Sequence, residues 1–78
     1  MKIIKGVKAT KVDSSNIDKI GYDEDSQTLE IHFQNGGQYQ YHPVTKKTYL
    51  ALISAPSIGG YFFKNIGNDK NISFEKLV

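Results

Sequence analysis

The stretch LEIHFQNGGQYQYH, residues 29–42, decides the fold because apolar and polar side chains alternate on both sides of a glycine pair. The apolar positions recur with a period of two: Leu29, Ile31, Phe33, Tyr39 and Tyr41. A period of two is typical of strands that bury one face. The stretch therefore predicts two antiparallel strands joined by a tight turn.

The turn between these strands is predicted from side-chain parity, because directly opposed residues of an antiparallel pair point to the same face. We place Phe33 opposite Tyr39. This register leaves a three-residue loop, 35–37, with a glycine at its left-handed position. A two-residue Asn-Gly turn would set the tyrosines opposite Glu30 and His32, and we reject it.

The residues before this hairpin predict a third strand. Ile20 and Tyr22 alternate with a lysine and a glycine. Placing Tyr22 opposite Leu29 leaves a four-residue loop, 24–27, within a polar run, which is an ordinary hairpin length. The β-branched residues of the arm, 1–11, make it more strand-like than helical.

Downstream of the strands the period changes to that of a helix. Tyr49, Leu52 and Ile53 lie at i, i+3 and i+4. Thr45 is the predicted N-cap, and Pro56 prevents the helix from continuing.

A second short helix is predicted from Ser57 to a stop at Gly67. Its apolar positions recur every four residues: Ile58, Phe62 and Ile66. In the tail, Ile72 and Phe74 alternate and favour a last strand or extended segment. The predicted architecture is α+β, a small antiparallel β-meander of three or more strands with two short helices packed on one face.

Length and charge set the domain organisation. A chain of 78 residues has room for one domain, and we divide it into a basic N-terminal arm or edge strand, 1–11, and a single domain, 12–78. The arm carries four lysines and no acid, whereas the rest has six lysines against eight acids. All ten cations are lysines, so sequence-specific nucleic-acid readout by arginine is excluded.

The absence of cysteine removes disulfides and thiolate chemistry, and it favours a cytoplasmic location. No stretch resembles a signal peptide or reaches membrane-spanning length, so we expect no membrane partner.

Several motifs, taken in order, resemble the KTSC domain family. They cover about residues 12–76: SSNIDKIGYD (14–23), LEIHF (29–33), YQY (39–41), YLAL (49–52) and SIGGYF (57–62). KTSC domains occur alone in bacterial and phage proteins and at the C-terminus of some lysyl-tRNA synthetases. The resemblance implies the same α+β fold. It implies RNA binding only by association with those synthetases.

The starts of the two predicted helices form the candidate ligand site, because helix N-termini attract anions. Lysines lie in the first turn of the first helix, and small residues at the second start would let backbone approach a phosphate, with a lysine one turn later leaning back toward it. The candidate residues are Lys46, Lys47, Ser57, Gly59, Gly60 and Lys64. In the alternative interpretation the serine is an N-cap, the glycines permit tight packing, and the lysines are solvated.

Two other groups of residues are candidate sites. The rings of Tyr39 and Tyr41 could stack on bases, but parity assigns them to the core. On the polar face the predicted register sets Glu30 across from His42, near His32. These groups could ligate zinc or act as acid and base, but no motif spacing, nucleophile or oxyanion donor accompanies them, so we expect no metal, cofactor or catalysis.

The sequence thus predicts a small non-catalytic binding module. Its first-choice ligand is RNA, single-stranded nucleic acid or a nucleotide, held by lysines and helix N-termini. The alternative is a protein-interaction module, such as a phage-encoded modulator of a host protein or an accessory protein. A third hypothesis is a small hydrolase or nuclease that uses His32, His42 and Glu30. The oligomeric state stays open.

Overall fold

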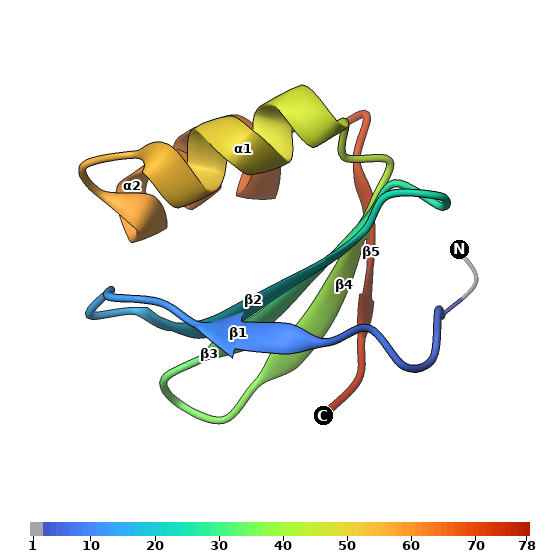
Figure 1. The fold of residues 1–78 in the computed structure, drawn as a ribbon, viewed down its shortest axis with the longest axis horizontal. Helices are drawn as coiled ribbons and strands as arrows, with labels where there is room; N and C mark the ends of the chain where they lie inside the picture. The colour runs from blue at the N-terminus through green and yellow to red at the C-terminus, as the bar shows by residue number, and fades with distance from the viewer. Residues whose placement is uncertain (1–2) are drawn as a thin grey trace.

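Antiparallel strands form one sheet in which each strand lies beside the next one in the chain (Figure 1). The structure, a computed structural model, describes residues 3–78. Within them the elements are β1 (Ala9–Lys11), β2 (Ile17–Asp23), β3 (Thr28–Phe33), β4 (Gln38–His42), α1 (Lys46–Ser54), α2 (Ile58–Phe62), the π-helix η1 (Phe63–Gly67) and β5 (Ser73–Lys76). The predicted α+β meander with helices is confirmed, and the tail joins the sheet as β5.

The β2–β3 hairpin has the predicted register. Tyr22 pairs with Leu29 and Asp23 with Thr28, so the four-residue loop is 24–27. The Asp23 carboxylate accepts a hydrogen bond from the Ser26 backbone N–H, 3.2 Å away, which stabilises this loop.

The β3–β4 register differs from the predicted one. Leu29 pairs with Tyr41 and Ile31 with Tyr39, so the expected pairing of Phe33 with Tyr39 was wrong. Because the loop starts and ends one residue earlier than predicted, the partner of each residue changes by two positions. A change of two positions keeps every side chain on its predicted face of the sheet. The apolar face therefore stays as predicted.

Gly36 occupies the left-handed position of the observed loop. It has a φ of 94°, in the left-handed region, and its N–H donates to the carbonyl of Phe33 at 3.0 Å. Phe33 N–H in turn bonds to the Gly37 carbonyl at 2.8 Å. The loop is therefore 34–36, with the first glycine of the pair in the left-handed position rather than the second.

Both helices start where the sequence predicts. The hydroxyl of Thr45 accepts from the Thr48 N–H, and that of Ser57 accepts from the Gly60 N–H, both at 3.2 Å. Helix α1 ends at Ser54, with Ala55 as its C-cap directly before Pro56. The second helix changes to π geometry after α2 and ends at Gly67, the predicted stop.

The core lies between the sheet and the helices, which pack on one face (Figure 1). Its fully buried members come from both layers: Ile17, Leu29, Ile31, Val44, Leu52, Phe62 and Ile66. Tyr41 is 8 % exposed and belongs to this core, whereas Tyr39 is half-buried against it. The tyrosine rings thus point inward as parity predicted, but Tyr39 lies at the border of the core.

The arm contributes strand β1 at its end, and β1 pairs with β2 at the edge of the sheet. Gly21 on β2 permits this close approach, because a Cβ there would lie 2.7 Å from the Lys8 carbonyl oxygen. Within residues 3–78, no helix combines the length and apolar character that crossing a membrane requires.

Candidate functional site

An open hollow of about 520 Å³ lies where β3, β4 and β5 face α2 and η1. Six aromatic side chains line it: Phe33, Tyr39, Tyr41, Phe62, Phe63 and Phe74. Asn35, Gly67 and Asn68 complete the lining. We call this site the aromatic hollow.

The sheet supplies the floor of the aromatic hollow. Tyr39 and Tyr41 are successive inward-facing residues of β4, and Phe74 of β5 pairs with Tyr41 and so shares its face. The Phe74 ring centroid lies 6.1 Å from that of Tyr39 and 6.0 Å from that of Tyr41. Tail and hairpin therefore build one continuous aromatic surface.

The helical side supplies the wall. Phe62, fully buried, sets its ring edge-to-face on Tyr41 with centroids 5.1 Å apart. Phe63, the next residue, stacks toward Phe33 at 6.4 Å with 24° between the ring planes. Consecutive phenylalanines thus serve two purposes, since the first fills the core and the second lines its opening.

The exposure of the rings differs within both the floor and the wall. Phe63 is 48 % exposed and Phe74 is 62 % exposed, whereas Tyr41 is nearly inaccessible. Burial, with a smaller contribution from Tyr39, raises the pKa of Tyr41 to about 12. The Tyr41 phenol is therefore neutral at physiological pH. The hollow offers aromatic faces and amide groups, with no charged group among its lining residues.

Lysines flank the aromatic hollow. Lys64 follows Phe63 on η1, and Lys76 pairs with Tyr39 and so projects from the same sheet face. Lys70 lies in the loop before β5, one residue after Asp69, and all four of these side chains are exposed. Flexible cations thus stand near a surface of exposed rings.

The predicted ligand site is divided by the length of α1. Lys46 and Lys47 lie in its first turn, and Ser57 follows its far end (Figure 1). Nine helical residues span about 13 Å at 1.5 Å each, so the two helix starts do not meet. Lys46 pairs with Glu24 at 3.1 Å, but both side chains are more than half exposed, and such a pair contributes little stability.

At the start of α2 the glycines permit close packing. A Cβ on buried Gly59 would lie 3.2 Å from Nδ2 of Asn16, and one on Gly60 would lie 2.9 Å from Oγ of Ser57. Gly59 therefore admits the loop before β2, and Gly60 admits the cap. Lys64 lies beyond this turn on η1, directly after Phe63, which lines the aromatic hollow.

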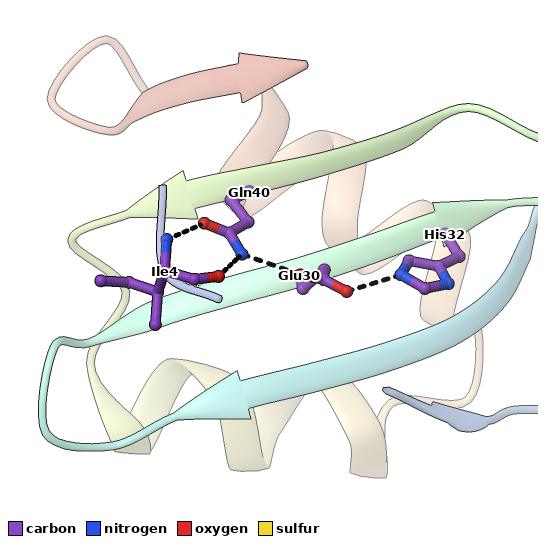
Figure 2. A network of polar contacts seen from close by, with 4 residues as sticks. All are labelled: Ile4, Glu30, His32 and Gln40. Carbon is purple, nitrogen blue, oxygen red and sulfur yellow. Dashed lines mark hydrogen bonds and ion pairs between the residues drawn. The ribbon is translucent and has the colours of Figure 1, made fainter. Parts of the chain in front are cut away.

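The polar face of the sheet carries a chain of polar contacts from Ile4 through Gln40 and Glu30 to His32 (Figure 2). The Glu30 carboxylate accepts from Nε2 of Gln40 at 2.8 Å and contacts Nε2 of His32 at 2.7 Å. Gln40, with no exposed surface, also donates to the Ile4 carbonyl at 2.7 Å and accepts from the Ile4 N–H at 2.9 Å. The side-chain amide of Gln40 thus bonds to both the N–H and the carbonyl of Ile4 in the arm.

The observed register corrects the expected arrangement of this face. Glu30 pairs with Gln40 rather than with His42, because the loop after β3 begins one residue earlier than predicted. Each Glu30 oxygen has a partner within the sheet. Among residues 3–78, no three acidic or imidazole side chains gather in a way that could hold a metal ion.

The aromatic hollow is not among the candidate sites that the sequence predicts. Parity assigns Tyr39 and Tyr41 to the core, and the alternation of Ile72 and Phe74 predicts a last strand or extended segment without saying which strand it pairs with. The pairing of Phe74 with Tyr41 joins residues 33 positions apart, which no local pattern reports. The adjacent Phe62 and Phe63 were the available signal, because one short amphipathic helix cannot bury both.

Fold and surface together describe a small α+β domain with an aromatic hollow on one side. Residues 13–69 match the model of the KTSC domain family, and the chain belongs to that family. The crystal structure of the KTSC domain protein YPO2434 from Yersinia pestis is similar, with a TM-score of 0.84 and 33% sequence identity. The match covers 94% of this chain and 100% of that one.

One curated relative is similar in sequence. An uncharacterized protein of Stutzerimonas stutzeri (strain A1501) is 36% identical over 56 residues, which are 72% of this chain and 79% of the relative.

Proposed function

We propose that this chain is a non-catalytic binding module for single-stranded nucleic acid, and that bases stack in the aromatic hollow. The observation that carries the proposal is the exposure of Phe63 and Phe74 at the opening of a hollow lined by six aromatic side chains. Stacking of a base on an aromatic side chain contributes about 1–3 kcal/mol.

The flanking cations support a polyanionic ligand. Lys64, Lys70 and Lys76 stand on the elements that form the hollow or on the loop next to them. Lysine is a point charge that contacts phosphate without reading base edges. Binding is therefore expected to tolerate many sequences. Lys46 and Lys47, in the first turn of α1, are not among the lining residues of the hollow, and we assign them at most outer phosphate contacts.

Binding to a fluorescent eight-nucleotide single strand tests the proposal. Phe74→Ala should weaken binding about tenfold, which corresponds to the loss of one stacked base. Leu50→Ala is the matched control, because Leu50 on α1 is 46 % exposed and lies outside the hollow. Equal affinity of the Phe74→Ala variant and the wild type would exclude the hollow as the site.

Salt dependence gives an independent test. Contacts to about three phosphates should weaken binding roughly tenfold or more between 50 and 200 mM salt, because bound counterions are released. An affinity that does not change with salt concentration would contradict a role for the lysines.

A protein-interaction module is the second candidate, and one observation favours it. Strand β5 ends the strand order, so its outer edge and the exposed ring of Phe74 lie together at a side of the sheet. A partner strand could pair there. The A260/A280 ratio of protein purified at low salt separates the two candidates, because co-purifying nucleic acid raises it and a protein partner does not. For either function we propose the reducing cytoplasm, which suits a chain without cysteine.

A further inference from the structure

Two further hollows extend the row that begins at the aromatic hollow, each sharing lining residues with its neighbour. A hollow of about 310 Å³ shares Phe33, Asn35 and Phe63 with it. That middle hollow in turn shares Ser15 and Asn16 with a hollow of about 240 Å³ at the start of α2. The shared lining residues place the three hollows side by side in a row, which we call the groove and which runs from β5 to the loop before β2.

The far end of the groove is polar. Its walls are residues 13–16 and 56–59. The Ser14 hydroxyl oxygen accepts from the Ile17 N–H at 3.2 Å, and that of Ser57 accepts from the Gly60 N–H at 3.2 Å. Because each oxygen already accepts a backbone hydrogen bond, each hydroxyl has its proton to offer a ligand.

Asp13 decides which ligand group suits this polar end. Its carboxylate repels a phosphate but accepts a hydrogen bond from a hydroxyl. Beside it, the Asn16 amide and the two serine hydroxyls can donate. A group that both donates and accepts, without negative charge, is complementary to this set. A ribose 2′-hydroxyl is such a group, and it is absent from DNA.

We propose that the groove binds a single strand of RNA across several nucleotides, with bases at the aromatic end and ribose hydroxyls at the polar end. This inference rests on the proposed function and specifies its ligand. The lysines near Phe63 and Phe74 contact phosphates, and the acidic polar end contacts sugar. A free mononucleotide fills only the aromatic hollow. We expect a site of about four nucleotides, near the lower end of the range for small single-strand binding domains.

The experiment compares RNA and DNA homopolymers of one to six nucleotides, uridylates against deoxyuridylates, on the full chain. RNA affinity should rise with each nucleotide up to about four. RNA should bind about three- to tenfold tighter than DNA at that length, as expected for one or two hydrogen bonds to ribose. Equal affinities for RNA and DNA, or a plateau at one nucleotide, would overturn the inference.

Two variants locate the effect at the polar end. Ser15→Tyr adds bulk where the middle and polar hollows meet, so it should lower tetranucleotide affinity severalfold and leave mononucleotide affinity unchanged. Ala51→Tyr is the matched control, because Ala51 is exposed on α1 and lines none of the three hollows. Asn16→Ala should lower the ratio of RNA affinity to DNA affinity. Equal effects of the two tyrosine variants would overturn the inference.

The proposed function and this inference fail in different ways. If binding depends on Phe74 but not on strand length or ribose, the ligand is confined to the aromatic hollow and only the inference fails. If neither RNA nor DNA of any length binds, the proposed function fails with it. Binding of an extended peptide that Ser15→Tyr abolishes, with no binding of RNA, would likewise overturn the RNA assignment.

Discussion

The rings of Tyr22 and Tyr49 stack with centroids 4.5 Å apart and planes within 7°, which ties α1 to β2. The Tyr22 hydroxyl also donates to the carbonyl of Val44 at 2.6 Å, just before the Thr45 cap. Burial is the main cause that raises the pKa of Tyr22, and the neighbouring Glu24 and Asp23 add to it. The phenol therefore stays neutral and keeps donating at physiological pH.

Tyr22→Phe removes this hydrogen bond while the stacked ring remains. We expect the free energy of unfolding to fall by about 1 kcal/mol, the typical net value of one hydrogen bond. Urea denaturation followed by circular dichroism measures it. Tyr61→Phe is the control, because Tyr61 is also half-buried against the core. An equal loss in both variants would show that the bond to Val44 contributes nothing specific.

Gly36→Ala tests the observed turn. The φ of Gly36 is in the left-handed region, and a Cβ there would meet no atom within 4 Å, so the cost is backbone strain alone. We expect a loss of about 1–2 kcal/mol in the free energy of unfolding. Gly36→Asn should lose less, because asparagine tolerates this conformation. If alanine costs no more than asparagine, the left-handed glycine is not at position 36.

Local rules predicted the parts of the fold that depend on neighbours in the chain. The Thr45 and Ser57 caps and the loop 24–27 each follow from a few adjacent residues. The β3–β4 register did not, because Gly36 and Gly37 both suit the left-handed position and both choices preserve parity. The choice between two adjacent glycines needs the full packing of the sheet.

The candidate site was less predictable than the fold. The proposed residues Ser57 and Gly59 line the polar end of the groove, but the rings that dominate the site come from five elements. Phe74 reaches β4 only because the tail returns to the sheet, and Gln40 reaches Ile4 across 36 positions. The hydrophobic period and side-chain parity assign residues to the faces of a helix or strand. They do not show which exposed residues of different elements lie next to one another.

Gln40→Ala tests the attachment of the arm to the polar face. The variant loses both bonds to Ile4 and leaves one Glu30 oxygen without its amide donor, so we expect a loss of about 2–3 kcal/mol in stability. The Ile4 amide should exchange with deuterium faster, and trypsin should cleave sooner after Lys5. Hydrogen exchange and timed proteolysis measure these effects.

The control for that variant is Gln38→Ala, on the same face of the same strand. It should leave Ile4 exchange unchanged. Unchanged exchange in Gln40→Ala as well would mean that the arm is held by contacts other than this amide.

The raised pKa of Tyr41 predicts a stability loss in alkali. The unfolded tyrosine ionises near pH 10, whereas burial holds the folded group protonated until about pH 12. Between these values the unfolded state has lost a proton that the folded state keeps, so the free energy of unfolding falls as pH rises. Below pH 10 both states are protonated and the contribution is constant. Urea midpoints measured from pH 8 to 11.5 should therefore decline above about pH 10.

Tyr41→Phe supplies the comparison for this decline. Phenylalanine keeps the ring against Phe62 and cannot ionise, so the variant should lose less stability between pH 10 and 11.5 than the wild type. Tyr22, whose pKa is also raised, should preserve part of the slope in the variant. Parallel declines in the two proteins would mean that Tyr41 ionises equally in the folded and unfolded states, and would place its ring in water rather than in the floor of the hollow.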